Sequence, residues 1–472
     1  MLGVAQQFST QFQLKESENF GLNPLDASFE HKAFPIVSSD KQNVLLLLST
    51  SGILRAELLN NRLRPQQSLS ANIPEVKELN VLMGGFQLDS MNYVAVFSNK
   101  KRNSFSAFQV QLDQDSISAT DFSLRFKGER LLHTFTTSEG YYIVTVQNRS
   151  SIIKIYKLFR SLRGTLSLSR YAYDFSDEEE DRTLPNLHKE LMEFTERGNQ
   201  RLVKIGDQTK VKLAVAGSYF KLYQTEEKLT LTLDHIHGRT SIYEMYLNSN
   251  IKNFQLINYP SYVANNLYQY NANSILIGDT LVQMAISKED LEITFHDLPS
   301  EEVVREINLS RAVMDTAAIG HFFKGEEMKG RKSSRKMKKL LREIVKGQAA
   351  FALFYDDKRE NLAIETGSYQ NGYNGPLTDI GQTQDALDYV QAETRQRSMF
   401  SLVVDPEGIP IQGYHERTDP PIPIEDFKKE NKIRNPIIET IFRLNNQHFY
   451  CWHNLQTNRI VIRKIRKVAT GP

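Results

Sequence analysis

Apolar and polar residues along the chain follow a strand-like pattern that repeats at a constant interval. Three mostly apolar runs align without gaps, 49 residues apart each time (43 to 92 and 92 to 141): residues 43–50, 92–99 and 141–148. A second run of strand length follows each of them within a few residues, at 53–58, 105–112 and 152–158. Continuous apolar runs are typical of strands packed on both faces, whereas outer strands alternate between apolar and polar residues. The pattern therefore predicts repeated β-sheet units.

Later units are more diverged but keep the same order. Paired runs begin near residues 228 and 241, 274 and 291, 350 and 361, and 448 and 459. The step from about residue 142 to 229 is nearly twice the repeat, which leaves room for an extra unit or an insertion. Groups of short strands that recur every ~40 to 50 residues resemble the β-propeller superfamily in general, in which each unit buries a face against its neighbours. The chain has no Trp-Asp dipeptide and no kelch double-glycine signature.

This resemblance implies an all-β fold, a β-propeller of about seven or eight blades with helical insertions. The alternative is two stacked β-domains. We expect residues 1–12 to be an N-terminal tail or signal remnant and residues 13–472 to form the propeller. Three segments interrupt the repeat: an acidic, helical one at 174–200, a basic amphipathic helix at 320–347, and a mobile loop with a short helix at 365–397.

The first and second insertions carry opposite charge. Residues 174–196 contain nine acidic and two basic residues, and residues 324–346 contain ten basic and three acidic ones. The basic segment predicts a helix between a Ser334 N-cap and Gly347 at its C-terminal end. Its apolar face comprises Met337, Leu340, Leu341, Ile344 and Val345. The opposite face comprises Arg335, Lys338, Lys339, Arg342 and Lys346, which are the candidate partner-binding residues.

Four interpretations of this basic face stay open. The helix docks on the propeller and leaves a solvated basic face, with the acidic insertion as one candidate neighbour, or it binds a partner protein. It lies on an anionic membrane surface, or it contacts nucleic-acid phosphates. Cations in the first turn oppose the helix dipole, so another interaction is expected to offset them.

Composition limits the function classes. The net charge is +2, so affinity for a polyanion would come from a local patch. The single cysteine, Cys451, excludes an intramolecular disulfide and Cys-based zinc sites. No apolar run approaches the ~18 to 20 residues that cross a bilayer, so no transmembrane segment is expected. The short apolar N-terminus resembles the end of an export signal.

Candidate catalytic chemistry is sparse in the sequence. No nucleophile elbow, phosphate-binding glycine-rich loop or zinc-protease motif occurs. His235 and His237 lie one strand-step apart without a visible third ligand, and Cys451 shares a strand face with Phe449, as a core thiol would. We therefore predict no catalytic, cofactor-binding or metal residues and no cofactor, although acids from scattered blades would escape such a scan.

The functional prediction is a non-enzymatic scaffold or interaction subunit of a larger protein assembly. The N-terminus and the weak resemblance to bacterial envelope-associated propeller proteins favour envelope or secretion machinery and a periplasmic or envelope-associated location, with the cytoplasm as alternative. The partners expected are other proteins, with an anionic surface second and nucleic acid not favoured. The alternative functions are an intracellular scaffold that binds a polyanion through the basic helix and a propeller-type hydrolase.

Overall fold

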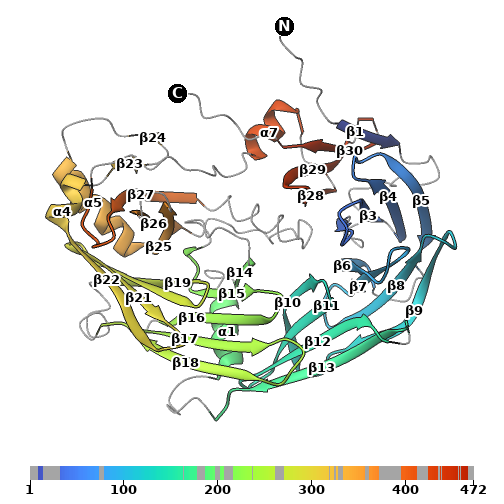
Figure 1. The fold of residues 1–472 in the computed structure, drawn as a ribbon, viewed down its shortest axis with the longest axis horizontal. Coiled ribbons are helices and arrows are strands. Elements are labelled where there is room, and N and C mark those ends of the chain that lie inside the picture. Colours follow the sequence, from blue (N-terminus) through green and yellow to red (C-terminus); the bar gives the residue numbers. More distant parts are fainter. Residues whose placement is uncertain are drawn as a thin grey trace, which may run out of the picture.

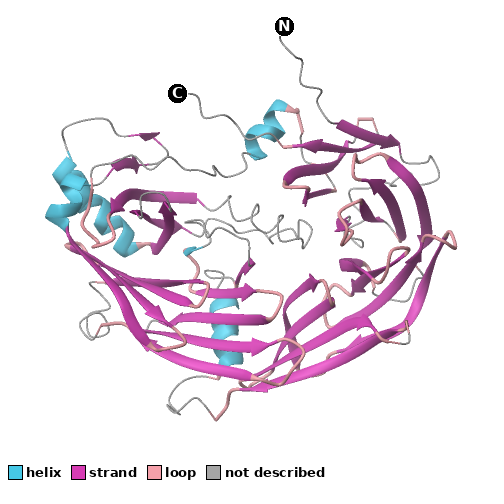
Figure 2. Ribbon diagram, viewed as in Figure 1, coloured by secondary structure: helices cyan, strands magenta, loops and turns pink. Residues whose placement is uncertain are grey.

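Seven β-sheets arranged around a common centre make up the molecule (Figure 1). This computed structural model describes residues 9–13, 32–50, 52–73, 79–162, 164–177, 186–196, 202–206, 216–235, 238–260, 270–317, 319–323, 326–327, 333–356, 361–370, 395–411, 424–433, 436, 438–454, 456–457 and 459–465. Strands predominate, and the few described helices lie beside the sheets (Figure 2). We number the sheets as blades 1 to 7 in chain order.

Blades 1 to 3 are regular four-stranded antiparallel sheets. Blade 1 contains β2 (Lys32–Val37), β3 (Asn43–Thr50), β4 (Ile53–Asn60) and β5 (Pro65–Asn72). Blade 2 contains β6 (Val81–Gln87), β7 (Asn92–Ser98), β8 (Ser104–Gln111) and β9 (Ser116–Arg125). Blade 3 contains β10 (Glu129–Thr137), β11 (Gly140–Gln147), β12 (Ile152–Arg160) and β13 (Leu166–Asp174). The first strand of each blade faces the centre, where β2 contacts β6 and β6 contacts β10.

Blades 4 and 5 keep this order, with one addition. Blade 4 contains β15 (Phe220–Gln224), β16 (Lys228–His235), β17 (Arg239–Tyr246) and β18 (Lys252–Asn258), and β14 (Val203–Gly206) pairs in parallel with β15 on the inner edge. Blade 5 contains β19 (Asn271–Ile277), β20 (Thr280–Ile286), β21 (Asp290–Asp297) and β22 (Glu302–Ser310). The long step in the sequence repeat before residue 229 therefore holds an insertion rather than a further blade.

Blades 6 and 7 both take an outer strand from a distant part of the chain. In blade 6, β25 (Gln348–Asp356), β26 (Asn361–Gln370) and β27 (Arg395–Val404) are followed outward by β23 (Ile319–Phe323) and β24 (Glu326–Glu327), which precede them in sequence. In blade 7, β28 (Glu439–Leu444), β29 (Gln447–Asn454) and β30 (Arg459–Lys464) are followed by β1 (Ser9–Gln13).

Residues 9–12, part of the predicted tail at 1–12, belong to a strand of blade 7, whereas residues 1–8 lie outside the described residues. Ser9–Gln13 pairs antiparallel with β30, and Phe12 is opposite Ile460. A strand that completes a sheet more than 400 residues away has no partner in its local sequence, so pattern alone gives no sign of it. Segment 320–347 likewise contributes an outer blade strand besides its helix. In segment 365–397 the two ends belong to β26 and β27, and residues 371–394 with most of the predicted short helix lie outside the described residues.

The repeated apolar runs of the sequence are β3, β7 and β11, the second strand of each blade. Their residues are buried almost throughout, whereas the outermost strand β9 has no buried residue. This confirms the repeat and the difference between packed and outer strands. The strands nearest the centre, β2, β6 and β10, lie before these runs and were not predicted.

Four helices occur in the described part of the chain: α1 (Leu187–Glu196), α4 (Arg311–Ala317), α5 (Ser333–Lys346) and α7 (Ile424–Glu430). Leu187 and Leu191 of α1 are buried in one cluster with residues of blades 3 and 4, such as Val144 and Leu231. Phe427 of α7 covers Trp452 of blade 7. None of the described helices is long and apolar enough to cross a membrane.

A buried ion pair connects the central strands of blades 4 to 6. The ammonium Nζ of Lys221 donates to Asp234 Oδ2 at 3.0 Å and to Asn273 Oδ1 at 2.7 Å. Asn273 in turn donates its amide to the Ala349 carbonyl of blade 6. Lys221 has no exposed surface, so this carboxylate and amide replace its hydration.

Candidate functional site

Helix α5 lies between blades 5 and 6 and is held there by its apolar face. Met337, Leu340, Leu341 and Ile344 are buried in one cluster with side chains from both blades, including Met284 and Phe351. Burial of side chains of this size stabilises the packed state by about 1.5–3 kcal/mol each. The helix is therefore part of the propeller core, and its orientation is fixed.

The C-terminal end of α5 is fixed by specific hydrogen bonds. The Gly347 amide donates to the Glu343 carbonyl at 3.0 Å, which closes the last turn as the sequence predicts. Asn271 of blade 5 donates its amide to the carbonyl of Gly347 at 2.6 Å. The helix begins at Ser333, one residue before the predicted cap.

The basic face of α5 points away from the core. Lys338, Lys339, Arg342 and Lys346 are exposed, while the side chain of Arg335 lies outside the described residues. An interfacial membrane helix needs its apolar face in the lipid. Because blades 5 and 6 bury that face, α5 does not offer it to lipid, and contact of its basic face with an anionic membrane surface stays a prediction.

The acidic insertion lies at a different position in the ring. Its helix α1 packs between blades 3 and 4, and α5 packs between blades 5 and 6 (Figure 1). Acidic residues 178–181 lie outside the described residues. Charge pairing between the two insertions therefore stays a prediction.

A second basic region, which the sequence analysis missed, is a pocket of about 190 Å3 near the centre of the ring. Its lining comes from the β7–β8 turn of blade 2, strand β10 of blade 3 and strand β14 of blade 4. It contains Lys101, Arg102, Arg130, Leu131, Leu132, His133, Thr134 and Lys204. Four of these described side chains are cations and none is acidic, a composition that favours a positive potential.

A β-bulge in β10 shapes one wall of this pocket. The register with β11 shifts between Leu131 and His133, so that Leu131 pairs with Thr145 and His133 with Val144. In a regular strand successive side chains point to opposite faces. The bulge bends the strand and changes where its side chains point. It accounts for a pocket wall formed by five consecutive residues, from Arg130 to Thr134.

The turn that carries Lys101 and Arg102 is fixed by its own hydrogen bonds. The Arg102 amide donates to the Asn99 carbonyl at 2.8 Å, and the Asn99 side chain accepts from the Asn103 amide at 3.0 Å. Phe126, just before β10, donates its amide to the Asn103 carbonyl at 2.8 Å. These bonds connect the turn of blade 2 to the start of blade 3 and position Arg102 beside His133.

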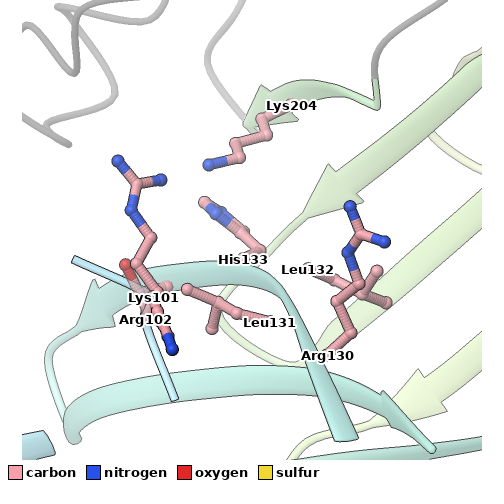
Figure 3. A pocket seen from close by; sticks show the side chains of 8 residues that line it. Lys101, Arg102, Arg130, Leu131, Leu132, His133 and Lys204 are labelled. Carbon is pink, nitrogen blue, oxygen red and sulfur yellow. The ribbon is translucent and has the colours of Figure 1, made fainter. Parts of the chain in front are cut away.

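Lys204 reaches the pocket from the inner edge of blade 4. Its strand β14 is held by Ile205, which is buried in a cluster with Tyr223 and Leu276. Lys204 pairs with Leu222 in the parallel register. Arg102, His133 and Lys204 lie around the same space (Figure 3).

His133 is the only titratable buried group among the residues that line the pocket. It is 2% exposed and stacks on Phe135, with the ring centroids 5.5 Å apart. Burial lowers the pKa of its imidazole well below the usual value, and the charge of Lys204 lowers the pKa further. The ring is therefore neutral near pH 7. Its side-chain hydrogen bond is with Gln224, and within the described part of the chain its Nδ1 has no partner.

Cys451, which was also singled out in the sequence, lies apart from both basic regions. Cys451 is fully buried beside Phe449, which raises the pKa of its thiol and confirms a core position. His237 and the side chain of His235 lie outside the described residues. Among the residues that the structure describes, no group of three or more His, Cys, Asp or Glu side chains is arranged to hold a metal ion.

The strand order and the central position of each first strand define the chain as a β-propeller, with seven blades in the described residues. No protein-family model and no curated protein sequence matches it. Solved structures with similar folds include the Nup133 β-propeller domain of Vanderwaltozyma polyspora, with a TM-score of 0.35 and 8% identity over 97% of this chain and 99% of that one. The WD40 domain of SCAP from fission yeast has a TM-score of 0.33 and 9% identity, covering 93% and 96%. The Dos1 propeller has a TM-score of 0.32 and 6% identity, covering 93% of each chain.

At these TM-scores the similarities carry no argument about function. The assignment of the fold rests on the strand pairing of this chain.

Proposed function

We propose that this propeller is a non-enzymatic interaction scaffold that binds an acidic surface of a partner protein through the basic face of α5. The observation that carries the proposal is the division of this helix into two faces. Four apolar side chains lie in the core between blades 5 and 6, and four cations are exposed on the other side. A rigid helix presents its charges in a fixed arrangement, so little conformational entropy is lost when a partner binds.

The chemistry of this face favours an acidic protein surface. Complementary charge at an interface increases the association rate and selects against wrong partners. The exposed cations lie one turn apart, as Lys338 and Arg342 do, and form a row along the helix. Glu343 is the one acidic residue in the fourteen-residue helix, so the net charge of this row is positive.

The test is charge reversal on the basic face with a matched control elsewhere. The variant Lys338→Glu/Arg342→Glu should weaken partner binding by about tenfold or more, because like charges then face each other. The control Arg62→Glu/Arg64→Glu reverses two exposed cations on blade 1, beside the β4–β5 turn. Proteins that co-purify at low salt are compared for the wild type and both variants, and the partner's affinity is then measured with purified components.

Equal loss of binding in both variants, or no loss in the α5 variant, would contradict the proposal. Recovery of nucleic acid that disappears at raised salt would instead favour the alternative of a polyanion-binding scaffold. For a propeller-type hydrolase we expect acids or histidines from several blades at the centre. The central pocket draws on three blades, but its lining supplies cations and a single histidine.

The location in a bacterial envelope stays a prediction from the N-terminal residues. Its test is fractionation of the native host, with the protein followed in the envelope and cytoplasmic fractions. Recovery in the cytoplasmic fraction alone would contradict it and leave the interaction proposal intact.

A further inference from the structure

The geometry points to a second binding site, independent of α5: we propose that the central pocket binds the phosphate group of a phosphorylated ligand. The pocket lies at the junction of blades 2, 3 and 4, and α5 packs between blades 5 and 6. The two sites use different residues, so an experiment can contradict one proposal and leave the other intact.

Charge is the first argument for an anion. Among the described residues that line the pocket, four are cations and none is acidic, and the cations come from three separate elements. Arg102 and Arg130 have planar guanidinium groups that bind two oxygens of one oxyanion at once, and Lys101 and Lys204 add point charges. This combination suits a doubly charged group better than a single carboxylate.

Size is the second argument. Pockets that enclose drug-sized ligands have volumes of ~300 to 1,000 Å3. At about 190 Å3 this pocket is smaller and suits one charged group rather than a whole nucleotide. The remainder of a larger ligand would extend from the open side of the pocket.

His133 supplies the third argument. Its Nδ1 is buried without a partner within the described residues, although the ring lines the pocket. An unsatisfied buried polar atom is uncommon in native proteins and calls for an explanation, one of which is a bound ion. A phosphate P–OH group in the pocket would donate to this nitrogen if the nitrogen is unprotonated, and a phosphate oxygen would accept from it if the nitrogen carries the proton.

The fixed backbone around these groups supports the assignment. The bulge in β10 brings five consecutive residues to the wall, and hydrogen bonds within the β7–β8 turn hold Arg102. Lys204 belongs to β14, which pairs with β15 at the inner edge of blade 4. A site built on rigid strands is arranged before the ligand arrives.

Calorimetric titration with inorganic phosphate, at constant ionic strength set with sodium chloride, tests the proposal. Wild-type protein should give saturable binding. The variant Arg102→Gln/Lys204→Met should bind phosphate about tenfold more weakly or worse, because two charge-assisted contacts are lost. The matched control Arg62→Gln/Lys288→Met removes the same two residue types from exposed positions outside both sites and should bind as the wild type does.

Folding of each variant is checked by its melting temperature without phosphate. If Arg102→Gln/Lys204→Met is unstable, Arg102→Gln alone and the charge-preserving Arg102→Lys form the pair, and the lysine variant should recover part of the binding. Absence of saturable binding to the wild type, or equal weakening in the control Arg62→Gln/Lys288→Met, would overturn the proposal.

Two further probes distinguish the source of the phosphate. A peptide with one phosphoserine that binds more tightly than free phosphate indicates a phosphorylated protein, whereas equal affinity indicates a small phosphorylated molecule. Equal binding of the same peptide with unmodified serine would overturn the site, because the phosphate group would then contribute nothing.

Discussion

The two basic regions of this propeller are built in opposite ways. On α5 the cations are neighbours in sequence and stand on the outer face of one helix, in contact with water. In the pocket they come from positions 101, 102, 130 and 204 and surround one small space beside a buried imidazole. At ~0.1 M salt, interactions between exposed charges more than about 10 Å apart are largely screened, whereas partly buried charges such as Arg102 and Lys204 are screened less. The first arrangement suits a broad acidic surface and the second a single anionic group.

A third cation, Lys221, shows what complete burial requires. It lies on β15, adjacent to the strand that carries Lys204, and its carboxylate partner Asp234 is also buried. Tyr259 and Thr240 donate their hydroxyls to the other carboxylate oxygen, Asp234 Oδ1, at 3.2 and 2.8 Å. A cation without solvent thus requires a paired and hydrogen-bonded carboxylate.

The largest effect is expected from Asp234→Asn, which leaves Lys221 buried without a counter-charge. Breaking a buried ion pair by removing one partner costs about 3–5 kcal/mol. The free energy of unfolding, measured by denaturant titration, should fall by this amount. The conservative replacement Asp234→Glu keeps the charge and should cost less. A loss below about 1 kcal/mol for Asp234→Asn would show that the pair does not stabilise blades 4 to 6.

The next largest effect on the free energy of unfolding is expected from a substitution on the buried face of α5, compared with one on its exposed face. Leu341 is fully buried between blades 5 and 6, so Leu341→Ala should lower the free energy of unfolding by about 2–5 kcal/mol. Lys338→Ala, on the exposed face of the same helix, should change it by no more than about 0.5 kcal/mol. Denaturant midpoints of the two variants give the comparison. Similar losses for both would mean that the basic face also stabilises the fold.

The sequence reveals features that local pattern encodes. The 49-residue repeat follows from the second strands, which are apolar throughout because both faces are packed. Helix α5 was predicted with nearly correct ends because its apolar spacing and its C-terminal glycine are local signals. The basic face was predicted for the same reason.

Features that depend on distant pairing were not predicted. Strand β1 joins blade 7 and β23 joins blade 6 from elsewhere in the chain. Strand β10 was also missed, because charged and polar residues such as Glu129, Arg130 and His133 interrupt its apolar pattern. The pocket depends on this strand and on cations up to 103 positions apart (101 to 204). The only local sequence pattern that points to the pocket is the clustering of basic residues at 100–102 and 125–130.

The smallest effect concerns the protonation of His133 and tests how well the pocket excludes water. In the folded protein the pKa of His133 lies well below its usual value, and Lys101, Arg102, Arg130 and Lys204 line the same pocket. In the unfolded chain the imidazole titrates near pH ~6.5. Below that pH the unfolded state binds a proton that the folded state does not, so acidification favours unfolding.

The contribution of His133 to stability is thus complete above pH ~6.5 and falls as the pH decreases, by up to about 1.4 kcal/mol per pH unit. The free energy of unfolding, measured between pH 7 and pH 5, should fall less steeply in His133→Phe than in the wild type. His296, whose pKa burial also lowers, stays in both proteins, so the difference between the two slopes isolates His133. Lys204→Met should also flatten the slope, since it removes a charge that keeps the imidazole neutral. Identical slopes in all three proteins would place His133 in water and remove the contrast between a confined pocket and a solvated helix face.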